Sequence, residues 1–155
     1  MKKKKTIQWI LVVLWMLLIF FLSEQPAVDS KALSSDTAVW IVQIVEKICP
    51  CLEMQTTDIH SPLRKLAHFF LYFVLGIFFT QSLEGEKWNR KKKWIGVVLA
   101  CVLYAMSDEF HQAFVPGRGA QWSDVLIDSI GSMCGIGLTF LCKRHTLHRQ
   151  KKRVY

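Results

Sequence analysis

The sequence has few acidic residues, and it has no stretch in which basic residues spread along one face. It contains 20 Lys and Arg against 12 Asp and Glu, which gives a net charge of +8. Nucleic-acid-binding domains carry a comparable excess, but over a groove-sized surface. Here the cations form three clusters, and each cluster adjoins an apolar segment. This pattern excludes a nucleic-acid partner and favours contact with a membrane.

Cysteine motifs, internal repeats and other low-complexity segments are also lacking. Three of the five cysteines lie within apolar runs, where a thiol behaves as a small hydrophobe. Cys49-Pro50-Cys51 is the pair expected in an aqueous or interfacial region. It could bind a metal or pair oxidatively, but no second Cys pair and no His-x-His accompanies it, so we favour neither role.

Apolar residues, by contrast, are abundant. They make up 52% of the chain and fall into blocks about as long as a membrane helix. We therefore predict an all-α integral membrane protein in which residues 1–155 form a single domain. No Ala-x-Ala cleavage site follows the first block, so we interpret that block as an uncleaved first helix. Four transmembrane helices are expected at about 7–23, 62–83, 94–110 and 123–142, with Ser61, and Ser123 or Asp124, as N-caps of the second and fourth.

The distribution of Lys and Arg predicts the orientation of these helices. Of the 20 cations, 15 lie at the N-terminus, in the basic loop 84–93 and in the basic tail 143–155. Cytoplasmic loops are enriched in Lys and Arg, so both termini are expected in the cytoplasm. The outer segment 27–61 then contains a short amphipathic helix, Thr37 to Ile48, which is too short to span and is expected at the outer interface.

Ionisable residues are rare at membrane depth and are usually functional there. Arg64 and His68 are spaced i, i+4, as are Asp124 and Asp128, so each pair lies on one face of its helix. Both helices enter the membrane from the same side. We therefore predict that Arg64 faces Asp124 and that His68 faces Asp128, in the outer leaflet.

The third predicted helix brings more polar side chains to the same level, and a Gly-containing turn follows it. His68, Asp108 and Asp128 are the catalytic candidates, because a histidine held by a carboxylate can move a proton near neutral pH. Cations that hold a phosphate or carboxylate, together with their polar neighbours, form the candidate substrate site: Arg64, Lys65, Glu109, His111, Gln112, Arg118 and Asp124. This composition suits an anionic head group.

Two other interpretations of this polar region stay open. Several of its residues are of metal-ligating types: His68, Asp108, Glu109, His111 and Asp124. Their spacing matches no zinc motif, so we expect no metal and no other cofactor. Alternatively, the charges neutralise one another and hold the helices in register.

The fourth predicted helix carries a glycine face formed by Gly131, Gly135 and Gly137. The spacing Gly-x-x-x-Gly fits close helix apposition, so we predict that these residues pack helices rather than bind a ligand. This face and the Thr37 to Ile48 helix would also suit a membrane-protein partner or a homo-oligomer. A non-catalytic scaffold or binding protein is therefore the alternative function.

The polar motifs resemble those of the VanZ family. They read Arg64-Lys65-x-x-His68-Phe-x-x-Tyr72-x-x-Leu75-Gly76, then Asp108-Glu109-x-x-Gln112-x-Phe114-x-Pro116-x-Arg118 and Asp124-x-x-x-Asp128-x-x-Gly131, and Ser23-Glu24-Gln25-Pro26 ends the first helix as in that family. The similarity runs from Leu14 to Gly137. The founding member of the family is associated with low-level resistance to teicoplanin. The resemblance therefore implies a small multi-pass protein of a bacterial cell membrane.

Two positions depart from the family pattern. Asp128 stands where the family has Asn, which alters proton or metal chemistry, and Leu71 stands where an acid often precedes the tyrosine. Together with the site predicted above, the resemblance leads us to expect a protein that modifies or masks a cell-surface target and affects teicoplanin susceptibility. The expected ligand is an anionic membrane lipid or a lipid-linked cell-wall intermediate. The sequence leaves open whether the protein catalyses a reaction or only binds.

Overall fold

A computed structural model describes residues 2–24, 56–116 and 119–153, and every regular element in this part of the chain is a helix. The helices are α1 (Lys2–Glu24), α3 (Thr56–Ser82), α4 (Arg90–Gln112) and α5 (Trp122–Arg153). Each contains a stretch that is long and apolar enough to cross a membrane. The predicted all-α fold with four transmembrane helices is therefore confirmed. The amphipathic helix expected at Thr37 to Ile48 lies outside the described residues.

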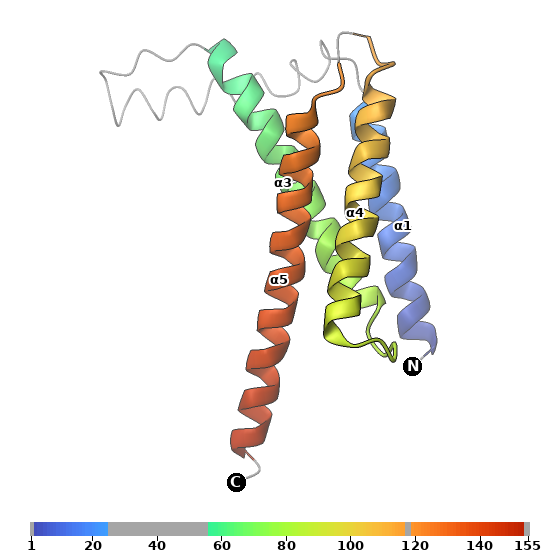
Figure 1. The fold of residues 1–155 in the computed structure, drawn as a ribbon, viewed down its shortest axis with the longest axis vertical. Helices are drawn as coiled ribbons and strands as arrows, with labels where there is room; N and C mark the ends of the chain where they lie inside the picture. The colour runs from blue at the N-terminus through green and yellow to red at the C-terminus, as the bar shows by residue number, and fades with distance from the viewer. Residues whose placement is uncertain (1, 25–55, 117–118, 154–155) are drawn as a thin grey trace, which may run out of the picture.

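The helices form a bundle in which α1 and α4 run one way and α3 and α5 run the other (Figure 1). The most extensive contact is between α3 and α5, and α4 contacts all three other helices. Among the described residues, α1 and α5 do not touch each other. Both termini lie at one end, here called the proximal end. The opposite, distal end is where α1 and α4 finish and where α3 and α5 enter the bundle.

The outer surface of the bundle is apolar, unlike that of a water-soluble protein. Large apolar side chains face outward, with Phe21, Phe110 and Leu126 between 64% and 69% exposed. Buried carboxylates, hydroxyls and an imidazole lie inside. An apolar surface of this extent is costly in water, but lipid solvates it without that cost. The chain is a multi-pass membrane protein.

The helices extend further than the sequence indicated. The second spanning helix begins at Thr56, not at Pro62, and Pro62 lies inside it. A proline removes a single backbone hydrogen bond, and here the helix continues through it. Ser61 is consequently a residue of the helix and not its N-cap.

The other helix ends show the same difference. α4 begins at Arg90 because the Asn89 side chain caps it, accepting a hydrogen bond of 2.8 Å from the Lys92 amide. α5 begins at Trp122, so Ser123 and Asp124 lie in its first turn and are not N-caps. At its other end α5 continues through the basic tail to Arg153, because that tail contains no proline or glycine to stop it.

Ion pairs at the proximal end join the N-terminus, the loop before α4 and the basic part of α5. Lys5 pairs with Glu86, and this cation holds the pKa of the Glu86 carboxyl below its usual value. Lys143 Nζ lies 2.5 Å from Glu84 Oε1. A cleft of about 330 Å³ at this end has a mainly basic polar lining: Thr80, Leu83, Glu84, Arg90, Lys93, Phe140, Lys143 and Arg144. Both termini are thus at one end, and their cytoplasmic location stays a prediction.

Glycine allows the close contact between α3 and α5. A Cβ atom at Gly131 would lie 2.3 Å from the Phe69 carbonyl oxygen, and one at Gly135 would lie 2.0 Å from the Phe73 carbonyl oxygen. The prediction that Gly131 and Gly135 pack helices is confirmed. It is wrong for Gly137, where an added Cβ would meet no atom within 4 Å.

We expect the Gly135→Ala substitution to destabilise the bundle by about 1–3 kcal/mol, because the new methyl group meets backbone that cannot rotate away. The measurement is the free energy of unfolding in detergent. Gly137→Ala is the matched control, since it adds the same methyl group to the same helix in open space. Equal stability of the two variants would contradict the close packing of α3 on α5.

Candidate functional site

The charged residues of three helices meet at the distal end of the bundle. Arg64 on α3 donates a hydrogen bond of 2.7 Å from Nη2 to Asp124 Oδ2 on α5. The Asp124 side chain is 1% exposed and the Arg64 side chain 28% exposed, so Arg64 lies at the edge of the site and Asp124 lies inside it. The predicted pairing of Arg64 with Asp124 is confirmed.

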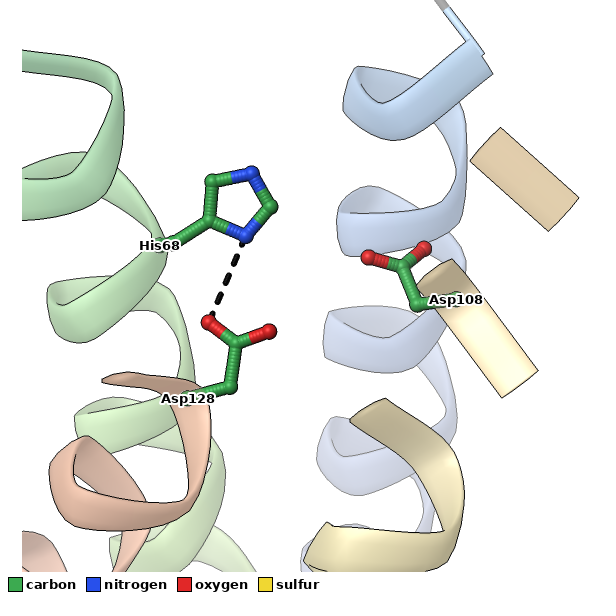
Figure 2. A group of neighbouring side chains, drawn as sticks. All are labelled: His68, Asp108 and Asp128. Atoms are coloured by element: carbon green, nitrogen blue, oxygen red, sulfur yellow. Dashed lines mark ion pairs between the residues drawn. The ribbon is translucent and has the colours of Figure 1, made fainter. Parts of the chain in front are cut away.

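One turn deeper, three ionisable side chains from three helices come together, and we call His68, Asp108 and Asp128 the buried triad. His68 Nδ1 lies 3.3 Å from Asp128 Oδ1, which confirms the predicted pairing of these two residues. Figure 2 shows Asp108 approaching from α4, with its carboxylate turned toward the other two side chains. Each residue offers one potential ligand atom, and these three atoms lie within 4.8 Å of one another.

A hydrogen-bond network orients Asp108 and connects it to Arg64. Ser23 Oγ on α1 donates to Asp108 Oδ2 at 2.8 Å. Gln112 Nε2 donates to the same Asp108 oxygen and to Ser23 Oγ, each at 3.2 Å. At its other end, Gln112 Oε1 accepts from Arg64 Nη2 at 3.4 Å. The network therefore holds one oxygen of Asp108 and leaves the other free.

Several buried polar atoms of the site have no hydrogen-bond partner among the described residues. They include Asp108 Oδ1, Asp128 Oδ2 and the Tyr72 hydroxyl. Asp128 and Tyr72 are fully buried, and Asp108 is 3% exposed. Buried polar groups are normally satisfied, and leaving one unpaired costs about 1–3 kcal/mol. Among the described residues, these unpaired buried atoms lie around His68, Asp108 and Asp128.

The remaining candidate residues lie around this centre rather than in it. Glu109 is buried, and its Oε2 accepts a hydrogen bond of 2.7 Å from the Gln121 amide just before α5. His111 stacks on Phe20 with ring centroids 4.5 Å apart. Lys65 is partly exposed beside Arg64. Arg118 falls outside the described residues, so its predicted role stays a prediction.

The sequence interpretation gave no site role to two residues that the structure places here. Ser23 is buried and anchors α1 to Asp108. Tyr72 lies one turn beyond His68 on α3, within electrostatic range of Asp108 and Asp128. The signal for Tyr72 was present in the spacing, because Arg64, His68 and Tyr72 recur every four residues and so share one face. For Ser23 the signal was its position at the end of an apolar run.

The charge balance limits what the site can do. Four carboxylates are buried at the distal end, those of Asp108, Glu109, Asp124 and Asp128, and Arg64 is engaged by one of them. His68 can neutralise Asp128 only when it is protonated. The arrangement thus offers carboxylates and an imidazole that can accept and return protons, next to an arginine at the edge of the site.

The comparison with protein families covers the part of the chain that contains these residues. The VanZ/LLP1 family matches residues 8–143. No match is found to a curated protein, and none to a solved structure. The matched range contains all of the buried triad, its hydrogen-bond network and the glycines of the α3–α5 contact. The chain belongs to the VanZ/LLP1 family.

Proposed function

We propose that this VanZ-like membrane protein uses the distal polar site to bind or modify an anionic lipid or a lipid-linked cell-wall intermediate, and thereby lowers susceptibility to teicoplanin. The distal end faces the outer side of a bacterial cell membrane in this proposal. Arg64 holds the anionic head group at the edge of the site. His68, Asp108 and Asp128 transfer protons deeper inside it.

The observation that carries this proposal is the set of unpaired buried atoms in the triad. Charges that serve only to join helices are expected to satisfy one another, as Arg64 and Asp124 do. In the fully buried carboxylate of Asp128, Oδ1 has only the 3.3 Å contact with His68 Nδ1, and Oδ2 accepts no hydrogen bond among the described residues. Such a group destabilises the bundle, so its presence supports a role in binding or catalysis.

The position of the site supports a lipid ligand. The triad lies four to six residues inside the distal ends of the candidate spans, about 6–9 Å along their axes. In this proposal an anionic head group enters from the distal end past Arg64, and the exposed apolar side chains contact the lipid chains. The deeper interior is an apolar core that includes Leu75, Val97 and Ile136, which disfavours transport through the bundle.

The scaffold alternative has less support from the described residues. It relied on the glycine face of α5 as a surface for a partner. Gly131 and Gly135 are instead packed against the α3 backbone within the same chain. Of the predicted partner surface, Gly137 remains open, and the Thr37 to Ile48 segment falls outside the described residues.

The test is teicoplanin susceptibility of a glycopeptide-sensitive Gram-positive host that expresses the wild type or Asp108→Asn at equal membrane abundance. We expect the wild type to protect and Asp108→Asn to lose most of the protection, because the amide cannot accept a proton as the carboxylate does. Thr139→Val is the control, since it deletes a buried hydroxyl whose one hydrogen bond within the described residues goes to Gly135 O on the same helix. Equal protection by all three proteins would contradict the proposal.

A further inference from the structure

We propose that the buried triad of His68, Asp108 and Asp128 binds one divalent metal cation of the Zn²⁺ or Mn²⁺ class. This inference rests on the proposed function in one respect, because it treats the same cluster as a working site. It adds the ion that the site requires.

The geometry brings the three ligand atoms to metal-binding range. They lie within 4.8 Å of one another and come from α3, α4 and α5 (Figure 2). Two ligand atoms of a tetrahedral site with bonds of about 2.1 Å are about 3.4 Å apart, so the three atoms have to approach one another by at most about 1.4 Å. Small side-chain rotations therefore suffice to place all three on one ion.

The oxygen atoms that a cation needs are the ones left unpaired. Asp108 Oδ2 accepts hydrogen bonds from Ser23 and Gln112, whereas its Oδ1 has no partner among the described residues. Asp128 Oδ2 accepts no hydrogen bond there, and Asp128 Oδ1 has only the contact with His68 Nδ1, which is the third potential ligand residue. Metal-ligating carboxylates are commonly oriented by hydrogen bonds to outer-shell groups, and Ser23 and Gln112 orient Asp108 in this way.

The charge of the site gives an independent reason for a cation. Arg64 is paired with Asp124, so it does not neutralise the triad. Asp108 and Asp128 are at most 3% exposed, and His68 supplies at most one positive charge. Removing two carboxylates from water is costly unless positive charge compensates them. A divalent ion supplies that compensation.

The donor atoms identify the class of ion. One imidazole nitrogen and two carboxylate oxygens, with no thiolate, favour Zn²⁺ or Mn²⁺, while the imidazole disfavours Ca²⁺ and Mg²⁺. Three protein ligands leave a coordination position open, as in catalytic rather than structural zinc sites. That position would take an oxygen of the anionic ligand. The departure of this chain from the family pattern at Asp128 adds one of the two charged ligands.

The experiment uses the full chain, purified in detergent, stripped with EDTA and titrated with Zn²⁺ or Mn²⁺. Cys49→Ser and Cys51→Ser are introduced throughout, so that their thiols cannot bind the probe. The readouts are metal content by elemental analysis and the shift in unfolding temperature. Asp108→Asn and Asp128→Asn remove triad ligands, and Glu84→Gln neutralises a carboxylate at the proximal end as the matched control.

We expect one tightly bound cation per chain, with affinity lowered at least about tenfold in each triad variant and unchanged in Glu84→Gln. The inference is overturned if the parent protein binds no cation, or if the triad variants bind like the control. If the protein binds no metal but Asp108→Asn loses protection, the metal site is refuted and the proposed function is supported. If the protein binds a metal through the triad but gives no protection, the metal site is supported and the proposed function is refuted.

Discussion

Replacing Arg64 with alanine is expected to destabilise the protein by about 3 kcal/mol or more, which is the largest stability effect of any single substitution considered. Asp124 is 1% exposed, and Arg64 Nη2 is its only cationic partner among the described residues. Removal of one member of a buried ion pair leaves the other charge uncompensated, at a cost of about 3–5 kcal/mol. The cost arises from Asp124, not from the loss of the arginine itself.

This cause can be separated from a simple loss of packing. Adding Asp124→Asn to Arg64→Ala removes the uncompensated charge, so the double variant is expected to recover most of the lost stability. Unfolding of the purified proteins in detergent measures both effects. Lys65→Ala is the control, because it removes a neighbouring cation that makes no ion pair within the described part of the chain. If the double variant is as unstable as Arg64→Ala alone, the pairing does not hold the distal end together.

Replacing His68 with glutamine is expected to abolish protection against teicoplanin at unchanged protein level. Glutamine keeps a hydrogen-bonding side chain of similar reach, but it cannot carry a proton between Asp128 and a ligand. Removal of a residue that transfers a proton lowers activity by about 10²-fold or more. The effect should therefore be close to complete.

The same variant distinguishes catalysis from binding. If the site only shields a lipid, a neutral hydrogen-bonding side chain should serve in place of His68, and protection should fall only in part. Protection is measured as the inhibitory concentration of teicoplanin, with membrane abundance matched by immunoblot. Thr139→Val again controls for loss of a buried polar group away from the triad. Full protection by His68→Gln would exclude the proton-transfer role.

The two cross-helix pairs of the site were predictable from the sequence. Arg64 with His68 and Asp124 with Asp128 have the same i, i+4 spacing, and their helices start at the same end of the bundle. Two adjacent helices that enter the membrane from the same side place residues of equal depth next to each other. This reasoning requires only helix periodicity and the direction of each span, and the structure confirms it.

What the sequence missed depends on how the helices are rotated and packed. It grouped Glu109, His111 and Asp124 with His68 and Asp108 as residues of metal-ligating types, whereas the structure brings Asp128 to His68 and Asp108. Glu109 turns toward the Gln121 amide, and His111 toward Phe20. Similarly, Gly137 shares a helix with Gly131 and Gly135 but not their contact with α3. Periodicity places residues on a face but does not say which neighbour that face meets.

The helix ends were misplaced for a local reason. Pro62 and Trp94 are common starting signals, but Asn89 caps α4 earlier, and α3 continues through its proline. Sequence signals of this kind mark where a helix can begin. The helix itself begins where the backbone N–H groups of its first turn are bonded by a capping side chain or by a preceding turn.

The central claim is that the buried triad is a working site and not a device that joins helices. Its most direct test is the unfolding temperature of Asp108→Asn in detergent with EDTA, compared with the wild type. A working site holds charge at the expense of stability, so the neutral variant should unfold at the same or a higher temperature although its protection is lost. If the unfolding temperature falls clearly instead, the Asp108 carboxylate stabilises the bundle, and the central claim is wrong.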